Sequence, residues 1–302
     1  MTQHFLAACL STPWALQPDR LAAYATVLAR HSGGQQRSAG PALDQAGALI
    51  EAAAPRAAGA RSGAIAVIPV IGTIMQRASM MQLCDGGTST QAISQALRQA
   101  QADETCSAII LEIDSPGGSV YGIAELAAEI RASTKPVTAI ANSLAASAAY
   151  WLGTAAGEFF VTPGGEVGSI GVWMAHEDVS QALSESGVGV SLVSAGKYKT
   201  EGNPYGPLDP EARDFMQSRV DDYFGAFTRD VAKGRDVQID AVRNGMGQGR
   251  VLGASQAKAE KMIDGVMTFD QVLRHVQRGA APMRGRSAQD QQRQRLALLD
   301  IE

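Results

Sequence analysis

Ser147 is the residue whose type and surroundings point most directly to chemistry. It lies in the small-residue stretch 145–149, between an apolar run over 135–141 and another over 150–156. This pattern predicts a buried strand that leads into a buried helix, with Ser147 at the helix N-terminus. Backbone N–H groups there lack intrahelical acceptors, so the Ala148 N–H could bind an oxyanion while the Ser147 hydroxyl attacks a carbonyl.

The motif around Ser147 is an alanine variant of the G-x-S-x-G elbow of serine hydrolases. Its short side chains would let a substrate backbone come close. A serine at such a junction is more often a helix cap or a small packing residue, so the motif needs support from other parts of the chain.

The elements that must position Ser147 follow a strand-helix alternation. Apolar strands are expected over 63–72, with Pro69 at a bend or edge, and over 107–113. Amphipathic helices are expected over 90–100 and 123–130. Their predicted buried faces comprise Ile93, Leu97 and Ala100 in the first helix and Ile123, Leu126, Ala127 and Ile130 in the second. This order predicts an α/β fold of right-handed β-α-β units with a mainly parallel sheet and flanking helices.

Further elements are expected after Ser147. Strands are predicted over 158–162, 164–174 and 188–193, and a helix over 180–185. A long helix starts at Asp209 as N-cap with Pro210 at its first position. Its apolar stripe predicts packing along the whole helix or against a neighbouring subunit; the stripe comprises Ala212, Met216, Val220, Tyr223, Phe227 and Val231.

Composition limits the classes of partner. The 302 residues are 45% hydrophobic and 19% charged, which excludes disorder of the whole chain. The net charge of −4 gives no electrostatic reason to expect nucleic acid or an anionic membrane. No apolar run is long enough for a transmembrane helix, and Leu6-Ala7-Ala8-Cys9 lacks the preceding Lys or Arg of an export signal, so a cytoplasmic protein is expected.

The cysteines and histidines form no ligand pattern, and no metal, no cofactor and a reducing compartment are expected. Three regions are predicted: an N-terminal helical or flexible arm over 1–62 with one helix near 20–29, a catalytic domain over 63–277, and an Arg- and Gln-rich flexible tail over 278–302. A last core helix is expected near 249–258, followed by a turn at Asp264-Gly265.

Three motifs together resemble the signal peptide peptidase A family of Ser-Lys peptidases, which shares the Clp protease and crotonase superfold. They are the turn Asp114-Ser115-Pro116-Gly117-Gly118, the Ser147 elbow, and Gly168-Ser169-Ile170-Gly171-Val172 with the later Tyr198-Lys199-Thr200. The likeness covers about residues 64–270.

The resemblance implies a role for each matching residue. Ser147 would be the nucleophile, Lys199 the general base, and Ser169 the hydroxyl that orients the lysine. The N–H groups of Gly118 and Ala148 would form the oxyanion hole. A lysine acts as a base where burial disfavours its ammonium form, so such a pair needs no histidine.

Lys197 competes with Lys199 for the role of base, since in a strand both would face the same side. Lys199 is preferred because the family pattern is Tyr-Lys-Ser/Thr.

Within the family, the chain is most similar to head maturation proteases of lambda-type phages. Shared features include residues 171–176, the turn 202–205 and Gln217-Ser218-Arg219. The resemblance implies protein substrates with small residues, among them scaffold or capsid-associated proteins and the chain itself, a homo-oligomeric ring, and a place in the host cytoplasm or procapsid interior.

Four alternatives remain open at this stage. They are a cytoplasmic signal-peptide-peptidase-like protease, a Clp-like Ser-His protease that uses His176, a crotonase-type acyl-CoA enzyme that uses Glu112 or Asp114, and an inactive scaffold subunit. Asp114 is expected instead to cap the Pro-Gly-Gly turn. Self-trimming in a protease is expected near residues 52–60 or 279–282.

Overall fold

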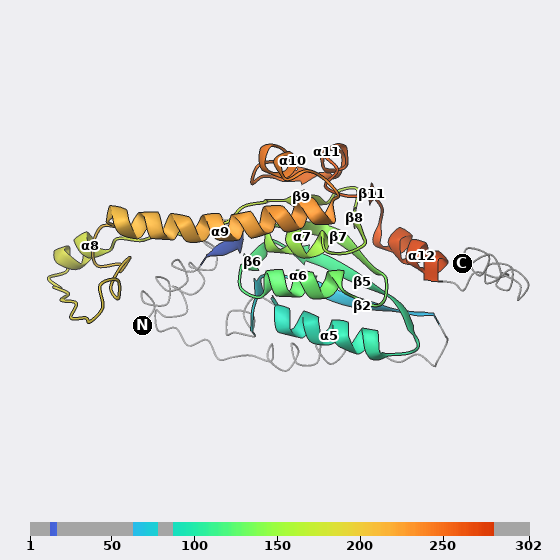
Figure 1. Cartoon of the computed structure of the whole chain (residues 1–302), viewed down its shortest axis with the longest axis horizontal. Coiled ribbons are helices and arrows are strands. Elements are labelled where there is room, and N and C mark those ends of the chain that lie inside the picture. The colour runs from blue at the N-terminus through green and yellow to red at the C-terminus, as the bar shows by residue number, and fades with distance from the viewer. Residues whose placement is uncertain (1–12, 17–62, 78–86, 281–302) are drawn as a thin grey trace, which may run out of the picture.

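A seven-stranded sheet forms the centre of the protein (Figure 1). The computed structural model describes residues 13–16, 63–77 and 87–280. Strands β2 (Ala64–Ile71), β5 (Cys106–Ser115) and β7 (Val137–Ala146) run parallel, and β2 lies at the edge, as the proline in its sequence indicated. The α/β class with a mainly parallel sheet is confirmed.

Strand β7 has two different neighbours on its far side. Its first half pairs in parallel with β8 (Glu158–Val161), and its second half pairs in parallel with β9 (Glu166–Gly168). Strand β11 (Gly265–Val266) extends the sheet beyond β8, and β10 (Val251–Gly253) pairs antiparallel with β9. β7 therefore continues five residues past the predicted end at residue 141, up to the residue before Ser147.

Helices cover both faces of this sheet. One face carries α5 (Thr90–Ala102), α6 (Ile123–Arg131), α7 (Ala148–Gly153) and the second half of α9 (Pro210–Gly234), which share one apolar core (Figure 1). The other face carries α12 (Phe269–Ala280), whose Val272 and Val276 pack in a smaller core with Ile110 and Ile140. Sheet residues alternate between the two cores because side chains alternate along a strand.

The predicted helix faces are confirmed in α5 and α6. Ile93, Leu97 and Ala100 of α5 are buried, and Ser89 caps this helix by accepting a hydrogen bond from the Ala92 N–H. In α6 the buried residues are those of the predicted stripe; they are Ile123, Leu126, Ala127 and Ile130.

A second sheet lies at the end of the central sheet where the Gly117-Gly118 turn is found. Its strands, in order, are β1 (Trp14–Leu16), β6 (Gly117–Ser119), β3 (Ile74–Met75) and β4 (Thr88–Ser89). Strand β1 was not predicted from the sequence; it brings residues 14–16 against the Gly117-Gly118 backbone.

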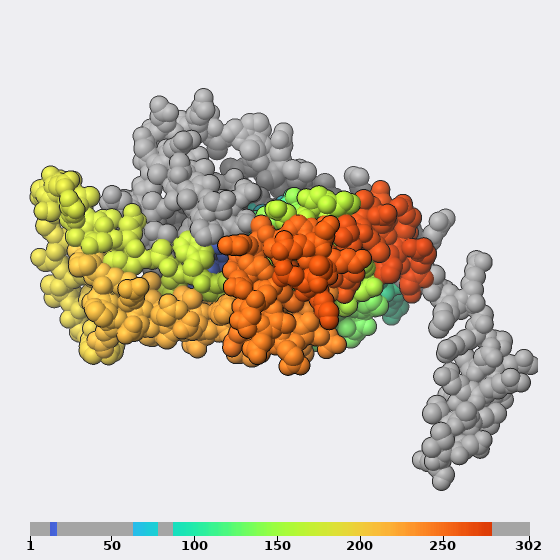
Figure 2. All heavy atoms as spheres, turned by 90° about the horizontal axis from the view of Figure 1, so that it is seen from above, coloured from blue at the N-terminus to red at the C-terminus, as the bar shows by residue number. Residues whose placement is uncertain are grey.

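Residues 177–208, which we call the arm, extend away from the rest of the protein (Figure 2). The arm contains α8 (Ser180–Glu185), as predicted, but the strand predicted over 188–193 is wrong. These residues have no strand partner in the described part of the chain and are exposed, with Val193 97% accessible. Apolar alternation alone does not make a strand where there is no neighbouring edge to pair with.

The first half of α9 lies beside the arm and is also largely exposed. Ala212 is buried, whereas Met216 and Val220 are only partly buried and Phe215 is 53% accessible. Phe227 and Val231, in the second half, are fully buried. The sequence predicted that the apolar stripe of α9 packs along its whole length or against a neighbouring subunit. Within one chain, only the second half of the stripe is buried.

The chain after α9 forms a small group of elements beside β9. Helix α10 (Ile239–Asn244) and helix α11 (Ala254–Ala259) flank β10. A helix was predicted near 249–258, but α11 overlaps only the second half of that segment, β10 takes residues 251–253, and α12 is a later core helix. The helix predicted near 20–29, the self-trimming sites at 52–60 and most of the tail lie outside the described residues. Over the described residues, no helix combines the length and hydropathy needed to cross a bilayer.

Candidate active site

Ser147 sits at a sharp turn between β7 and α7. Its backbone has φ 55° and ψ −119°, an unusual conformation for a residue with a side chain. Such a conformation costs about 1–3 kcal/mol and persists only where surrounding contacts enforce it. Here the Ser147 N–H donates to the Gly168 carbonyl at 2.7 Å, and the Ser147 carbonyl accepts from the Trp151 N–H at 3.0 Å.

The Ser147 side chain does not act as a helix cap. It makes no capping hydrogen bond to α7, and the contact recorded for its hydroxyl is a long one, 3.5 Å, to the Gly171 carbonyl. The residue is 1% accessible. The structure therefore excludes the helix-cap role for Ser147 and leaves its hydroxyl without a short hydrogen bond at the end of β7.

The turn before β6 approaches Ser147 closely. The Ser115 hydroxyl accepts a hydrogen bond from the Gly117 N–H at 3.2 Å and donates one to the Gly72 carbonyl at 2.6 Å. Ser115 thus caps the turn, and the expectation that Asp114 does so is wrong. The Asp114 side chain is exposed, because it points to the opposite face of β5 from the buried Ser115.

Gly117 has to be a glycine for two reasons. Its φ of 102° is unfavourable for other residues, and a Cβ at this position would lie 2.9 Å from the Ser147 Cβ and 2.2 Å from the Ala15 carbonyl oxygen. The backbone at Gly117 therefore passes directly beside Ser147. Gly118 follows Gly117 in β6, and Ala148 follows Ser147 as the first residue of α7, so the two residues predicted for an oxyanion hole come from different elements.

Ser169 is brought next to Ser147 through β9. It follows Gly168, whose carbonyl accepts the Ser147 N–H, and it has a φ of 55°. Its own N–H donates to the Arg250 carbonyl at 2.8 Å, which holds this second strained residue in place. The predicted residues Ser147, Gly118, Ala148 and Ser169 are thus assembled at one place.

Helix α7 is anchored by its aromatic residues. The Trp151 ring stacks on Phe227 of α9 with centroids 4.6 Å apart and an interplanar angle of 7°, and its indole N–H donates to Asp230 at 2.7 Å. Tyr150 is completely buried and donates its hydroxyl to the Met262 carbonyl. Burial raises the pKa of Tyr150 well above its ordinary value, so this residue stays neutral and structural.

Lys199 is not beside Ser147 in the single chain. It is exposed on the arm, in a turn in which its N–H donates to the Gly196 carbonyl. The neighbouring Lys197 forms an ion pair of 2.7 Å with Glu211 in the first turn of α9. Glu211 and Phe227 are sixteen residues apart on α9, which corresponds to about 24 Å along the helix axis. The part of the arm that contains Lys197 and Tyr198 therefore lies far from α7, which packs on Phe227 (Figure 1).

Lys197 is committed to other contacts. Its ammonium donates to Glu211 and to the Tyr198 hydroxyl, and these hydrogen bonds, the one to Glu211 first, raise the pKa of Lys197. A raised pKa favours the charged form, which is the wrong form for a base. This contact weakens the alternative that assigned the base to Lys197.

The residues of the rival mechanisms also have structural partners. The His176 Nε2 bonds to the Asn203 carbonyl at 2.9 Å, and because a carbonyl only accepts, this nitrogen is the donor. Glu112 accepts a hydrogen bond from the Asn142 side chain at 2.7 Å.

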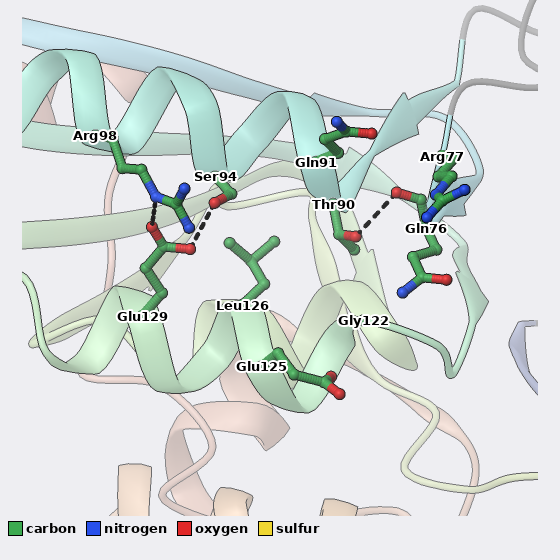
Figure 3. Close-up of a pocket in the computed structure, with 10 residues that line it drawn as sticks. All are labelled: Gln76, Arg77, Thr90, Gln91, Ser94, Arg98, Gly122, Glu125, Leu126 and Glu129. Carbon is green, nitrogen blue, oxygen red and sulfur yellow. Dashed lines mark hydrogen bonds and ion pairs between the residues drawn. The ribbon is translucent and has the colours of Figure 1, made fainter.

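A polar pocket of about 540 Å³ lies between α5 and α6, and Ser147 is not among its lining residues (Figure 3). Glu129 forms an ion pair of 2.6 Å with Arg98 across it and accepts the Ser94 hydroxyl at 2.6 Å. These contacts join the two helices. Within the described residues, no group of three or more His, Cys, Asp or Glu side chains is arranged to hold a metal ion.

Sequence reasoning missed Trp14, which borders the site, and gave no role to Trp173. Trp14 and Trp173 exchange backbone hydrogen bonds of 2.9 and 3.0 Å next to the Gly117-Gly118 turn. The short apolar run after Pro13 was the available signal, but three residues are too few to predict a strand.

Comparison with known proteins identifies related chains. A family model described as peptidase family S49 matches residues 129–281. The chain is 34% identical over 252 residues to the head-tail preconnector protein GP5 of Enterobacteria phage P21, covering 79% of this chain and 50% of that one. It is 39% identical over 180 residues to the capsid assembly protease C of Escherichia phage lambda, covering 58% of this chain and 41% of that one.

A bacterial relative extends the comparison. Protease 4 of Salmonella typhi is 32% identical over 217 residues, which cover 70% of this chain and 34% of the relative. The matched part of the chain spans half or less of the length of each of these three relatives.

Proposed function

The chain belongs to peptidase family S49, and we propose that it is a serine endopeptidase that processes phage head proteins with a Ser147-Lys199 dyad. The observation that carries the proposal is the Ser147 turn: a strained, buried serine with no capping bond, directly beside the Gly117-Gly118 backbone. A structural serine would have no need of that strain or of that close approach.

In the proposed reaction, the Ser147 Oγ attacks the scissile carbonyl carbon and neutral Lys199 accepts the hydroxyl proton. The N–H groups of Gly118 and Ala148 bind the oxygen that becomes negative. Lys199 then gives the proton to the departing amine, and water hydrolyses the acyl-enzyme by the same route. Ser169 orients the lysine through its hydroxyl.

We propose that Lys199 reaches Ser147 from a second copy of the chain. Within one chain the arm carries Lys199 away from α7, and the arm and the first half of α9 together expose several large apolar side chains. These are Val188, Val190, Leu192, Val193, Tyr198 and Phe215. Such a surface is typical of one that is covered in an assembly. A head-to-tail ring would place each arm over the next subunit's Ser147 and would bury the first half of α9.

Substrates are proposed from the phage relatives. A protease related to a capsid assembly protease would act on scaffold or capsid-associated proteins, in the host cytoplasm or the procapsid interior. No cofactor, nucleic acid or membrane takes part in this scheme.

Mixing two inactive variants tests the dyad and its assembly together. Ser147→Ala and Lys199→Ala should each lack peptidase activity on labelled casein, with the lysine variant losing about 1,000-fold. Lys197→Ala is the matched control and should stay active. When the two inactive proteins are dissociated, mixed and reassembled, about a quarter of the sites in a random ring combine an intact serine with a partner's intact lysine.

Recovery of activity in the mixture, near a quarter of the wild-type value, supports a dyad shared between copies. Activity that survives Lys199→Ala but not His176→Ala would instead establish the Ser-His alternative. Loss of activity in Lys197→Ala with retention in Lys199→Ala would reject the choice of lysine. Binding of coenzyme A by calorimetry, with no labelling of Ser147 by a fluorophosphonate, would favour the crotonase alternative.

A further inference from the structure

Residues 13–16 lie along β6, where the Ala15 carbonyl borders the Gly117 backbone beside Ser147. Trp14, Ala15 and Leu16 are 1%, 0% and 2% accessible, although they belong to the N-terminal region. They lie as strand β1 between two edges, pairing antiparallel with β6 on one side and with Trp173 on the other. An extended segment held at both edges next to a nucleophile is in the geometry that proteases impose on a substrate backbone.

The register shows which residue faces the oxyanion hole. Trp14 uses both its N–H and its C=O toward Trp173, at 2.9 and 3.0 Å. Because neighbouring residues of a strand direct these groups to opposite edges, Pro13 and Ala15 face β6. The Pro13 carbonyl indeed accepts the Val120 N–H at 3.4 Å, and Ala15 is aligned with Gly118.

The Ala15 carbonyl lies beside the nucleophile. Its oxygen and the Ser147 Cβ are 2.2 and 2.9 Å from the same point, the position that a Cβ on Gly117 would take. The peptide unit on the other side is fixed as well, since the Leu16 carbonyl accepts the indole N–H of Trp173 at 2.8 Å. The Ala15–Leu16 bond is therefore fixed by contacts on both sides, next to the backbone position that also borders Ser147.

We propose that residues 13–16 are the chain's own substrate and that Ser147 hydrolyses the Ala15–Leu16 bond, which empties the groove for other proteins. This inference rests on the proposed function. Ser147 Oγ would bond to the Ala15 carbonyl carbon, the bond to the Leu16 nitrogen would break, and that nitrogen would leave as an amine with the proton from the lysine. Water would then release the Ala15 carboxylate and restore Ser147.

Small size at residue 15 is part of the proposal. The side chain of Ala15 is fully enclosed, and its carbonyl already touches the Gly117 backbone position. Ala15→Phe should slow cleavage of the bond about 100-fold or more, whereas the matched variant Ala15→Ser should be cleaved at a rate close to that of wild type.

Intact mass and N-terminal peptide analysis of the full-length proteins test this inference during incubation at pH 8. Wild type and Ala15→Ser should lose residues 1–15 and gain Leu16 as a new N-terminus, and Ser147→Ala and Ala15→Phe should stay whole. A fluorogenic peptide copied from residues 9–22 and a fluorophosphonate probe report separately on the active site.

A wild-type protein that cleaves the added peptide and is labelled at Ser147, yet keeps its own Ala15–Leu16 bond, overturns the inference and leaves the proposed function standing. If added wild-type protein cleaves the Ala15–Leu16 bond of Ser147→Ala chains, the Ser147 of another chain cuts the segment. That result overturns the proposal that residues 13–16 are cleaved in the groove of their own chain. If neither wild type nor Ala15→Phe is labelled at Ser147 or hydrolyses the added peptide, the proposed function is refuted and this inference falls with it.

Discussion

Gly117→Ala should lower both the activity of the site and the stability of the fold. The added Cβ would lie 2.2 Å from the Ala15 carbonyl oxygen and 2.9 Å from the Ser147 Cβ. A carbon and a carbonyl oxygen ordinarily stay about 3.3 Å or more apart, so the peptide in the groove has to move by about 1 Å. A displacement of that size at a reacting centre costs about 100-fold in rate.

The same substitution should also destabilise the protein, because alanine is unfavourable at a φ of 102°. The expected loss in the free energy of unfolding is about 1–3 kcal/mol, measured by urea denaturation. Gly164→Ala is the matched control, since a Cβ there meets no atom within 4 Å. It should change stability by less than about 0.5 kcal/mol and leave kcat/KM for the fluorogenic peptide unaltered.

The refuting result is a Gly117→Ala protein with the kcat/KM of wild type. It would mean that substrates do not pass between Gly117 and Ser147. A folded variant with normal stability and lost activity would keep the account of the site but contradict the strain assigned to this turn.

Three other perturbations follow from the structure. Phe227→Ala removes the ring that stacks on Trp151 and should lower the free energy of unfolding by about 3–5 kcal/mol in urea denaturation; an unchanged midpoint would contradict the anchoring of α7 by α9. Burial disfavours the charged Asp264 carboxyl, but hydrogen bonds from Arg235 and the Phe159 N–H outweigh it, and the pKa of Asp264 falls below its ordinary 3.8. The charged Asp264 should contribute its full stabilisation above pH 3.8 and lose it as pH falls through the lowered pKa. Urea midpoints between pH 2 and 6 should therefore depend less on pH in Asp264→Asn than in wild type. An equal pH dependence would contradict the stabilising bonds to Arg235 and Phe159. Val193→Asp places a charge on the 97% accessible arm and should shift the assembly to smaller species in sedimentation velocity, whereas an unchanged distribution would remove the arm from the proposed interface.

Much of the central sheet could be predicted from the sequence, because its strands and helices have clear periodicities. The faces of α5 and α6 follow from the spacing of Ile93, Leu97, Ile123 and Ile130, and the structure buries each of them. The place of Ser147 also follows, since an apolar strand that runs into small residues and then into a buried helix permits few other geometries.

Features set by long-range contacts could not be predicted. The strand expected over 188–193 had the right alternation but no neighbouring edge, and β1 has only three residues that gain their structure from β6 and Trp173. Ser115, and not Asp114, caps the turn at Gly117 because the Ser115 side chain points to the buried face of β5. The role of Lys199 remains a prediction that needs a second copy of the chain.

Identification of the nucleophile tests the central claim most directly. The full-length protein, and the Ala15→Phe variant with its groove altered, would be incubated with a fluorophosphonate probe, digested and analysed by mass spectrometry. The account predicts a single modified peptide with the adduct on Ser147 and none in Ser147→Ala. An adduct on a different serine, or a protein that hydrolyses peptides while Ser147 stays unmodified, would contradict it.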